Sequence, residues 1–552
     1  MKRLGQLLVE KGLLPESQVE EAVQAQQQGD KRFLGTILLE RGWVEPEALL
    51  AVLAEQYQMP CVRLRDIPID RAAVERVPFK VALHYKVMPL RLQHAALTVA
   101  TANPQDVRLM DELQLALQQR YTFDFVLATE EDILRAIDKY YGIGAETVED
   151  ILSGDRAGGG SVARVEEGVQ DLERTTDDGS VVKLVNQLIL EAHRSRASDI
   201  HLEPYRSRVE LRYRIDGRLH RVDLPPATRQ LFPAIVSRVK VMSDLNLVER
   251  RMPQDGRASV KVGVEKIDLR VSVLPTPAGE SVVIRILPNR PLVELQQLGF
   301  RASDMEALEQ VIRKPHGLIL VTGPTGSGKT TTLYACLKSI NTEERKIITI
   351  EDPIEYEQEG NTQFQVNPQI GLTFANGLRS MLRHDPDVMM VGEIRDPETA
   401  ELAIRIALTG HLVFSTLHTN DAASAVIRLL DMGIDAYLIA SSVECVIAQR
   451  LVRVLCAACK EAVPSSNGSS TAFRAKGCEQ CQRTGYCGRI NVYEMLRMSE
   501  PIRQLVLEKA PADAIRRKAI ELGMRTMYED GAEKVRSGVT TKDEVTWVTQ
   551  EE

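Results

Sequence analysis

Residues 318–331 read LILVTGPTGSGKTT, an apolar run followed by a glycine-rich loop and the start of a helical pattern. This is the full pattern of a phosphate-binding P-loop in its required context, between a buried strand and a helix. The glycines let backbone N–H groups turn toward phosphate oxygens, and the helix N-terminus adds partial positive charge. We expect Lys329 to reach the β- and γ-phosphates of a nucleotide and Thr330 to coordinate Mg²⁺. The predicted nucleotide-binding residues are Gly323, Pro324, Thr325, Gly326, Ser327, Gly328, Lys329, Thr330 and Thr331.

The segments around this loop indicate one fold. From about 298 to 450, helical patterns alternate with short, nearly all-apolar runs at 318–322, 347–351, 388–391 and 412–416. Strands that are buried on both faces are typical of a parallel sheet with helices on each side. The sequence therefore predicts a doubly wound α/β domain.

Acidic and histidine side chains flank the later strands of this sheet. They are Glu351, Asp352, Glu355, Glu393, His411 and His418. Because ligands bind at the carboxyl ends of strands in doubly wound sheets, we expect all of them at that edge, beside the nucleotide. ATP hydrolysis needs a group that orients water and groups that hold Mg²⁺, and these carboxylates can supply both. The alternative for each histidine alone is an ordinary structural role.

Four of the eight cysteines occur in two close pairs. Cys456 and Cys459 are followed by Cys478 and Cys481, which gives the spacing C-x₂-C-x₁₈-C-x₂-C. This spacing is typical of a tetrahedral structural zinc site, and unligated reduced thiols are the alternative. The other thiols are expected to be core residues or, near the zinc segment, a stray thiol: Cys61, Cys336, Cys445 and Cys487.

The N-terminal half has a different organisation. Residues 4–26 and 34–56 form an internal repeat, each copy a short helix, a glycine stop and a second helix near a Pro-Glu pair. The segment 143–179 is rich in Gly, Asp and Glu, which favours a flexible linker. The predicted domains are a tandem helical repeat module (1–58), a small α/β domain (59–142), the linker (143–179), an α+β domain (180–297) and the α/β nucleotide domain with the zinc element 456–481 and a helical C-terminal end (298–552).

Composition and charge argue against several classes of protein. A chain of 552 residues is too long for one core. The net charge of −8 and an aromatic content of 5% are unlike a protein that binds nucleic acid directly. No apolar run approaches the roughly 20 residues that span a bilayer, and the N-terminus lacks a signal-peptide core. We expect a cytoplasmic protein that reaches a membrane only through partners.

Three motifs resemble a known family. IEDPIEY (350–356), VGEIRD (391–396) and LTGHLVFSTLHTND (408–421) look like the Asp box, Walker B motif and His box of the type II secretion and type IV pilus assembly ATPases. The resemblance extends over nearly the whole chain, including ASDIH (197–201) and PQDGR (253–257). It implies a homohexameric motor that hydrolyses ATP and works with inner-membrane platform proteins. It also implies a PAS-like N2 domain followed by a RecA-like ATPase domain.

The same resemblance implies roles for single residues. Glu355 would activate or orient the attacking water, and Glu393 would hold Mg²⁺ together with Thr330. His411 and His418 would sense the γ-phosphate. The N2 arginines that would approach the nucleotide are Arg257, Arg270 and, as a third candidate, Arg285. Surface salt bridges are the alternative for these arginines.

Two questions stay open at the level of sequence. LTGHLVFSTLHTNDAA and AQRLVRVLC look closer to the type II secretion branch, with pilus assembly as the alternative. A RecA-like nucleic-acid motor and a cyclic-di-GMP-gated scaffold with little turnover are rival classes. The N-terminal repeat resembles a module that binds cyclic-di-GMP in some pilus ATPases, on the residues Arg3, Leu4, Gly5 and Gln26. The second copy departs from that pattern, since Phe33 precedes its Leu-Gly pair, and we favour docking of an inner-membrane partner here.

Overall fold

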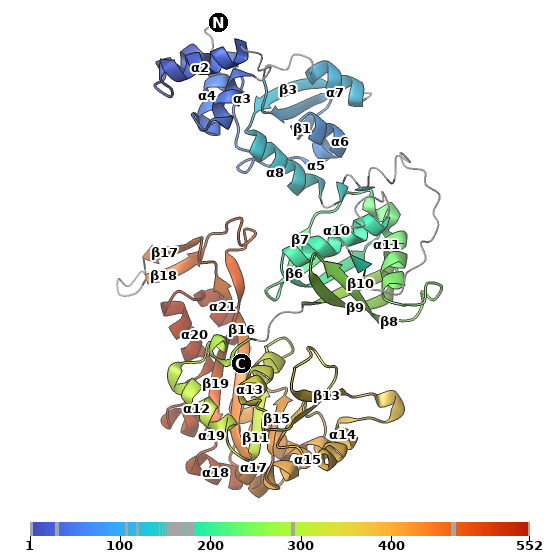
Figure 1. Ribbon diagram of the computed structural model, residues 1–552, viewed down its shortest axis with the longest axis vertical. Coiled ribbons are helices and arrows are strands. Elements are labelled where there is room, and N and C mark those ends of the chain that lie inside the picture. Colours follow the sequence, from blue (N-terminus) through green and yellow to red (C-terminus); the bar gives the residue numbers. More distant parts are fainter. Residues whose placement is uncertain are drawn as a thin grey trace. The chain divides into compact units, whose positions relative to one another are not determined.

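The computed structural model describes residues 4–27, 33–104, 109–117, 121–142, 144–145, 147–148, 151, 170–171, 181–288, 293–464 and 471–549. The chain forms two compact units, Met1–Leu287 and Pro288–Glu552. Figure 1 labels most helices and strands of each unit. In the described part of the chain, no helix is both long and apolar enough to cross a membrane.

The first unit begins with two pairs of helices. They are α1 (Leu4–Glu10), α2 (Glu16–Gln27), α3 (Leu34–Glu40) and α4 (Pro46–Tyr57). Gly12 and Gly42 follow the first helix of each pair with φ of 68° and 66°, a left-handed conformation that glycine adopts at little cost. Apolar side chains from all four helices, including Ala22, Leu38 and Leu53, form one core. The helices lie where the repeat predicts them.

A small α/β arrangement follows the repeat. Its elements are α5 (Arg71–Val74), α6 (Phe79–His84), β1 (Val87–Gln93), β2 (Ala96–Thr101), α7 (Leu109–Leu117), β3 (Thr122–Leu127) and α8 (Glu130–Tyr141). The sheet order is β1-β2-β3, with β1 and β2 antiparallel and β2 and β3 parallel. Cys61 is exposed, so its predicted place in a core is wrong: it lies in an irregular segment beside Leu127.

A seven-stranded sheet completes the first unit. In sheet order its strands are β4 (Gln170–Asp171), β8 (Gln254–Val262), β9 (Glu265–Thr276), β10 (Gly279–Pro288), β5 (Ala197–Pro204), β6 (Val209–Ile215) and β7 (Arg218–Val222). The helices α10 (Val181–Arg194) and α11 (Thr228–Met242) share its core. Most of the predicted linker lies outside the described residues, but β4, inside it, pairs with β8. The PAS-like description of this part stays a prediction.

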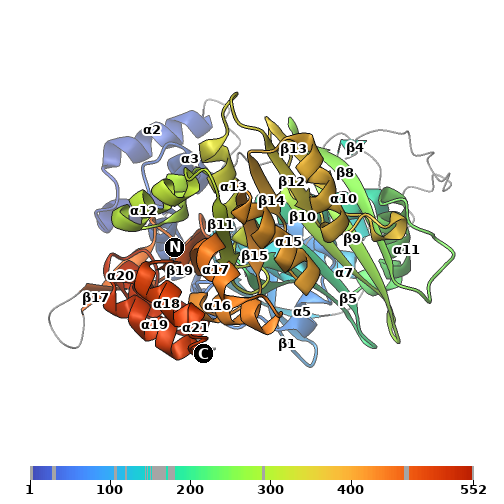
Figure 2. The ribbon, with the colours of Figure 1, turned by 90° about the horizontal axis from the view of Figure 1, so that it is seen from below.

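The second unit is built on another seven-stranded sheet. In sheet order its strands are β13 (Asn361–Gln365), β12 (Ile347–Glu351), β14 (Val388–Val391), β15 (Leu412–Leu417), β11 (Gly317–Thr322), β16 (Val443–Leu455) and β19 (Tyr486–Arg497). Figure 2 shows the strands from β13 to β11 side by side. All neighbouring strands run parallel except β16 and β19.

Helices cover both faces of this sheet, as predicted for a doubly wound domain. One face packs against α12 (Ala302–Ile312) and α13 (Lys329–Ile340). The opposite face packs against α14 (Phe374–Met381), α15 (Pro397–Leu408), α16 (Ala422–Asp431), α17 (Ala436–Ser442), α18 (Glu500–Leu507) and α19 (Ala512–Glu521). Successive residues of each strand pack in turn into the core on one face of the sheet and the core on the other. The strands are therefore apolar throughout.

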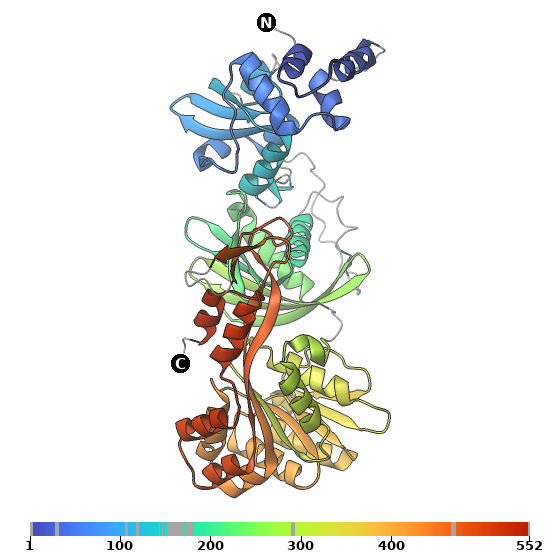
Figure 3. The ribbon, with the colours of Figure 1, turned by 90° about the vertical axis from the view of Figure 1, so that its left-hand side faces the viewer.

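The sheet extends further along the chain than the sequence indicated. The apolar runs of this domain predict strands only as far as residue 416, yet β16 and β19 form a long antiparallel pair, seen as orange strands in Figure 3. Polar residues inside β16, such as Gln449 and Arg450, interrupt the apolar run that marked the other strands. The hairpin of β17 (Lys460–Pro464) and β18 (Thr471–Ala475) and the helices α20 (Met527–Arg536) and α21 (Lys542–Thr549) complete the unit.

Candidate active site

The P-loop connects the carboxyl end of β11 to the first turn of α13. Gly323, Gly326 and Gly328 have φ of 148°, 81° and 88°, where a side chain would be strained. A Cβ on Gly323 would also lie 2.5 Å from the carbonyl oxygen of Gln449 and 2.6 Å from Ser327 Oγ. These glycines let the chain turn tightly against β16. The loop therefore has the shape of a phosphate cradle at a helix N-terminus.

Lys329 is held at the mouth of this cradle. Its ammonium donates to the carbonyl oxygens of Gly323 at 2.8 Å and Pro324 at 3.1 Å. Burial lowers the pKa of Lys329 to about 8, while Glu393 opposes this shift and Arg450 adds to it. A desolvated cation is costly unless an anion joins it, so the position favours a phosphate group.

Glu393 is the centre of a charged cluster beyond the end of β14. Its carboxylate lies 2.5 Å from Arg395 Nη2 and 3.1 Å from His418 Nε2. The hydrogen bond to Glu393 raises the pKa of Arg395, and the charge of Asp352 contributes. Asp352, Glu393 and His418 thus follow three neighbouring strands at one edge, as predicted. Arg395 is a further site residue, not predicted from the sequence although VGEIRD contains it.

The predicted carboxylates after β12 have different environments. Glu351 is 3% exposed and accepts hydrogen bonds from Tyr334, from Thr349 Oγ1 at 2.6 Å and from Gln363 Nε2 at 3.1 Å. Its expected place among the nucleotide-facing carboxylates is therefore wrong, because three donors, two of them buried, already satisfy it. Glu355 lies further along the segment, where its backbone N–H donates to Tyr334 Oη at 3.4 Å.

His411 lies at the other edge of the sheet. Its carbonyl oxygen accepts from the N–H of Gly317, at the start of β11, and Leu412 is paired with the same residue. The imidazole Nδ1 lies 3.3 Å from the carbonyl oxygen of Ile406. Six residues of β15 separate it from His418, about 20 Å of strand. The expectation that both histidines share the carboxyl edge is wrong for His411, because the strand runs between them.

The N2 arginines belong to the first unit. Arg257 and Arg270 are directly opposite in the antiparallel pair of β8 and β9. Like charges in this position repel each other. Arg285 instead pairs with Asp199 at 2.9 Å, as the salt-bridge alternative predicts. The approach of Arg257 and Arg270 to a nucleotide stays a prediction.

The four paired cysteines form one cluster. Their sulfur atoms all lie within 4.8 Å of one another. The separations are 3.8 Å for Cys456–Cys478 and 3.7 Å for both Cys459–Cys481 and Cys478–Cys481. A tetrahedron with Zn–S bonds of about 2.3 Å has edges of about 3.8 Å, so the donors fit zinc. Cys487 packs beside the cluster, whereas Cys336 and Cys445 are buried core thiols, as predicted.

The candidate cyclic-di-GMP residues are only partly described. Arg3 lies outside the described residues. Leu4 is buried in the helical core, and a Cβ on Gly5 would meet Val19 Cγ1 at 2.5 Å. Packing between helices therefore explains the Leu-Gly pair, and Gln26 lies near the end of α2.

The sequence of this chain matches known protein families and individual relatives. The family described as "Type II/IV secretion system protein" matches residues 174–547, and a MshEN domain matches residues 57–147. The type IV pilus assembly ATPase PilB of Myxococcus xanthus is 41% identical, covering 98% of each chain. The type II secretion system protein E of Xanthomonas campestris is 40% identical, covering 100% of this chain and 98% of the relative.

A solved structure supports the fold. The Legionella pneumophila ATPase DotB aligns with 70% of this chain and 100% of its own, with a TM-score of 0.52 at 21% identity. At that identity the likeness shows the fold alone. The matches in sequence, at about 40% over the full length, decide the relationship. This chain belongs to the family of type II secretion and type IV pilus assembly ATPases.

Proposed function

We propose that this chain hydrolyses MgATP at the P-loop and uses the energy to assemble a type II secretion pseudopilus. The observation that carries the proposal is a P-loop lysine, Lys329, at the same sheet edge as the contact of Glu393 with His418. A desolvated cation for phosphate and a carboxylate for a metal ion thereby meet at one sheet edge.

The residues divide the work of hydrolysis among them. The P-loop amides and Lys329 bind the phosphates, and Thr330 and Glu393 would hold Mg²⁺, which neutralises phosphate charge when bound. Glu393 is 13% exposed, and its charge opposes the lowering of the pKa of Lys329, which fits a metal-binding carboxylate beside the P-loop. Glu355 orients the attacking water, and His418 responds to the terminal phosphate. His411 has no part in this step because of its place at the opposite edge.

The proposal includes an assembly and its partners. The chain acts as a homohexamer in which Arg257 and Arg270, opposite each other on β8 and β9, stabilise phosphate charge. It is cytoplasmic and reaches the inner membrane only through platform proteins, without direct contact to nucleic acid. Zinc at the cysteine cluster is structural. The helical module 1–58 docks a partner, and cyclic-di-GMP binding is its alternative role.

Type IV pilus assembly is the second candidate function. The specific observation in its favour is the 41% identity to PilB over 98% of both chains. Deleting the gene and measuring both exported proteins in the medium and surface pili separates the two. Loss of pili with normal export would overturn the secretion proposal.

Phosphate release from the full-length protein tests the enzymatic part. Lys329→Ala should abolish hydrolysis, because the ammonium that binds the terminal phosphates is lost. Lys338→Ala is the matched control, since Lys338 is an exposed lysine of the same helix that pairs with Glu294. Equal rates for wild type and Lys329→Ala would refute hydrolysis at this loop.

A further inference from the structure

Gln449 supports the P-loop from the neighbouring strand. Its side chain is 1% exposed and donates to the carbonyl oxygen of Ser327 at 2.8 Å. It also accepts from Thr332 Oγ1 at 2.9 Å, in the first turn of α13. One amide thus fixes both the loop and the helix that follows it. The close approach of Gly323 to the backbone of Gln449 completes this support.

Arg450, the next residue of β16, reaches a different loop. Successive side chains of a strand point to opposite faces, so Arg450 lies on the face that α16 covers. It is 6% exposed and donates to Asn420 Oδ1 at 3.1 Å and to the carbonyl oxygen of Gln449 at 3.2 Å. Asn420 is exposed and comes two residues after His418.

The loop that carries His418 is also joined to the end of β11. The backbone N–H of Thr419 donates to Thr322 Oγ1 at 2.8 Å, and the two hydroxyls lie 2.7 Å apart. Thr322 directly precedes the P-loop. The His418 loop is therefore fixed at two points, one on the P-loop strand and one, through Arg450, on the strand beside it.

We propose that Gln449 and Arg450 are positioning residues that couple the two loops of the ATPase site. Gln449 sets the shape of the cradle, and Arg450, acting through Asn420, keeps His418 aligned with the phosphate that the cradle holds. This inference rests on the proposed ATP hydrolysis. Because the two residues have different roles, their variants should have different defects. Loss of Gln449 weakens nucleotide binding, whereas loss of Arg450 slows turnover of nucleotide that still binds.

A purely structural role is the rival explanation, and β16 offers its control. Arg453 is 9% exposed, three residues along the same strand, and its guanidinium binds Glu544 at 2.8 and 3.1 Å. This pair connects β16 to α21 and touches neither loop of the site. Arg453→Gln should therefore lower the melting temperature without changing kcat per folded protein.

The test compares kcat with the affinities for ADP and a non-hydrolysable ATP analogue in the full-length chain. Loss of a hydrogen bond from a charged group changes a rate or binding constant by a factor of about 10 to 100. Arg450→Gln should therefore lower kcat by that factor and change the Kd for ADP less than about threefold. Arg450→Lys should recover part of the rate. Gln449→Ala should raise the Kd for both nucleotides.

Asn420→Ala provides a variant on an exposed loop, which should fold even if Arg450→Gln does not. It should lower kcat as Arg450→Gln does, and the double variant should show no further loss. Any of three results would overturn the proposal. Asn420→Ala could keep the wild-type kcat, or the losses of kcat in the two single variants could add up in the double variant. Arg450→Gln could also lose kcat and ADP affinity equally. Failure of the underlying function is distinct, because wild type and Lys329→Ala would then release phosphate equally.

Discussion

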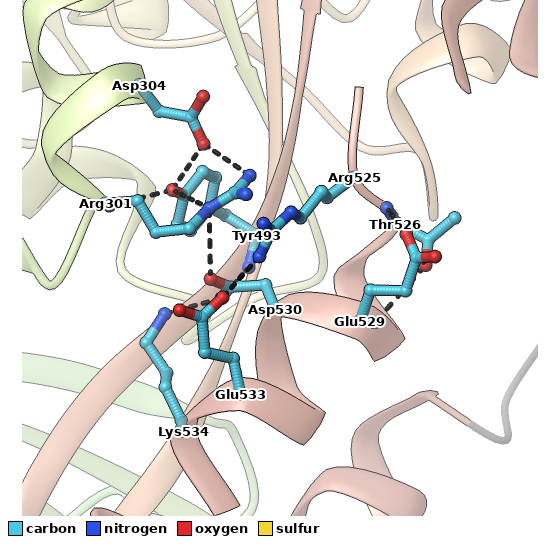
Figure 4. A network of polar contacts seen from close by, with 9 residues as sticks. All are labelled: Arg301, Asp304, Tyr493, Arg525, Thr526, Glu529, Asp530, Glu533 and Lys534. Atoms are coloured by element: carbon cyan, nitrogen blue, oxygen red, sulfur yellow. Dashed lines mark hydrogen bonds and ion pairs between the residues drawn. The ribbon is translucent and has the colours of Figure 1, made fainter. Parts of the chain in front are cut away.

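Replacing Asp530 with alanine would remove the centre of a buried polar cluster (Figure 4). Asp530 and Lys534, one turn apart on α20, form an ion pair and are 1% and 8% exposed. The backbone N–H of Tyr493 donates to the same carboxylate at 3.3 Å, and Arg301 lies 4.0 Å away. Tyr493 in turn donates to Asp304 at 2.7 Å. The cluster thus connects α20, β19 and the start of α12.

The size of the effect follows from the charge left behind. Breaking a buried ion pair by removing one partner costs about 3–5 kcal/mol, because the other charge stays desolvated. Lys534 would keep its contact with the ring of Tyr493, 5.0 Å from the centroid. We therefore expect Asp530→Ala to lower the free energy of unfolding by about 3 kcal/mol, at the lower end of that range. Changing Asp530 to Leu together with Lys534 to Met should recover most of the loss.

Fluorescence can isolate this unit, because the chain has only two tryptophans. Trp547 lies on α21, which packs against α20, so a Trp43→Phe background leaves one local probe. With a urea slope of about 1–3 kcal/mol/M, the midpoint should fall by roughly 1–3 M. Glu533→Ala is the control: its pair with Arg525 is 44% and 48% exposed, and such pairs contribute about 0–1 kcal/mol.

Two outcomes would contradict the expected effect of Asp530→Ala. If Asp530→Ala and Glu533→Ala shift the midpoint equally, burial does not set the cost of the unpaired lysine. If the double replacement costs the sum of the single ones, the two residues do not act as a pair.

Three further predictions concern the ATPase unit. Glu393→Gln should keep ATP binding but lower kcat by about 100-fold or more, because the carboxylate proposed to hold Mg²⁺ loses its charge; single-turnover phosphate release and nucleotide binding check this. His418→Ala should lower kcat by about 10- to 100-fold, whereas His411→Ala at the opposite edge should change it less than about threefold; equal losses would contradict the assigned edges. Cys459→Ser, or a strong chelator, should release one zinc per chain and lower the melting temperature, measured by metal analysis and calorimetry; an unchanged zinc content would contradict the site.

The sequence predicted those features that local pattern determines. The P-loop, the strands through 416 and the cysteine pairs each follow from short-range spacing, and the structure has them in place. The edge at which His411 lies could also have been read from chain direction, because His411 precedes its strand and only His418 follows it, at the carboxyl end where ligands bind. Glu351 also looked like a catalytic carboxylate, since its buried partner Tyr334 is 17 residues away in sequence. Contacts such as Gln449 with Ser327, 122 residues apart, leave no local signal.

Strand β16 connects the cysteine cluster to the nucleotide site, and its length decides how strongly they influence each other. It supports the P-loop at Gln449 and is anchored to α21 at Arg453. It ends at Leu455, directly before Cys456. About 20 Å of strand separates Gln449 from the first zinc ligand, with the Arg453–Glu544 ion pair between them. Loss of zinc should therefore loosen the far ends of β16 and β19 first, because the four cysteines lie at that end of the pair. The Arg453 anchor protects the P-loop support, so destabilisation of the unit should precede any loss of nucleotide affinity.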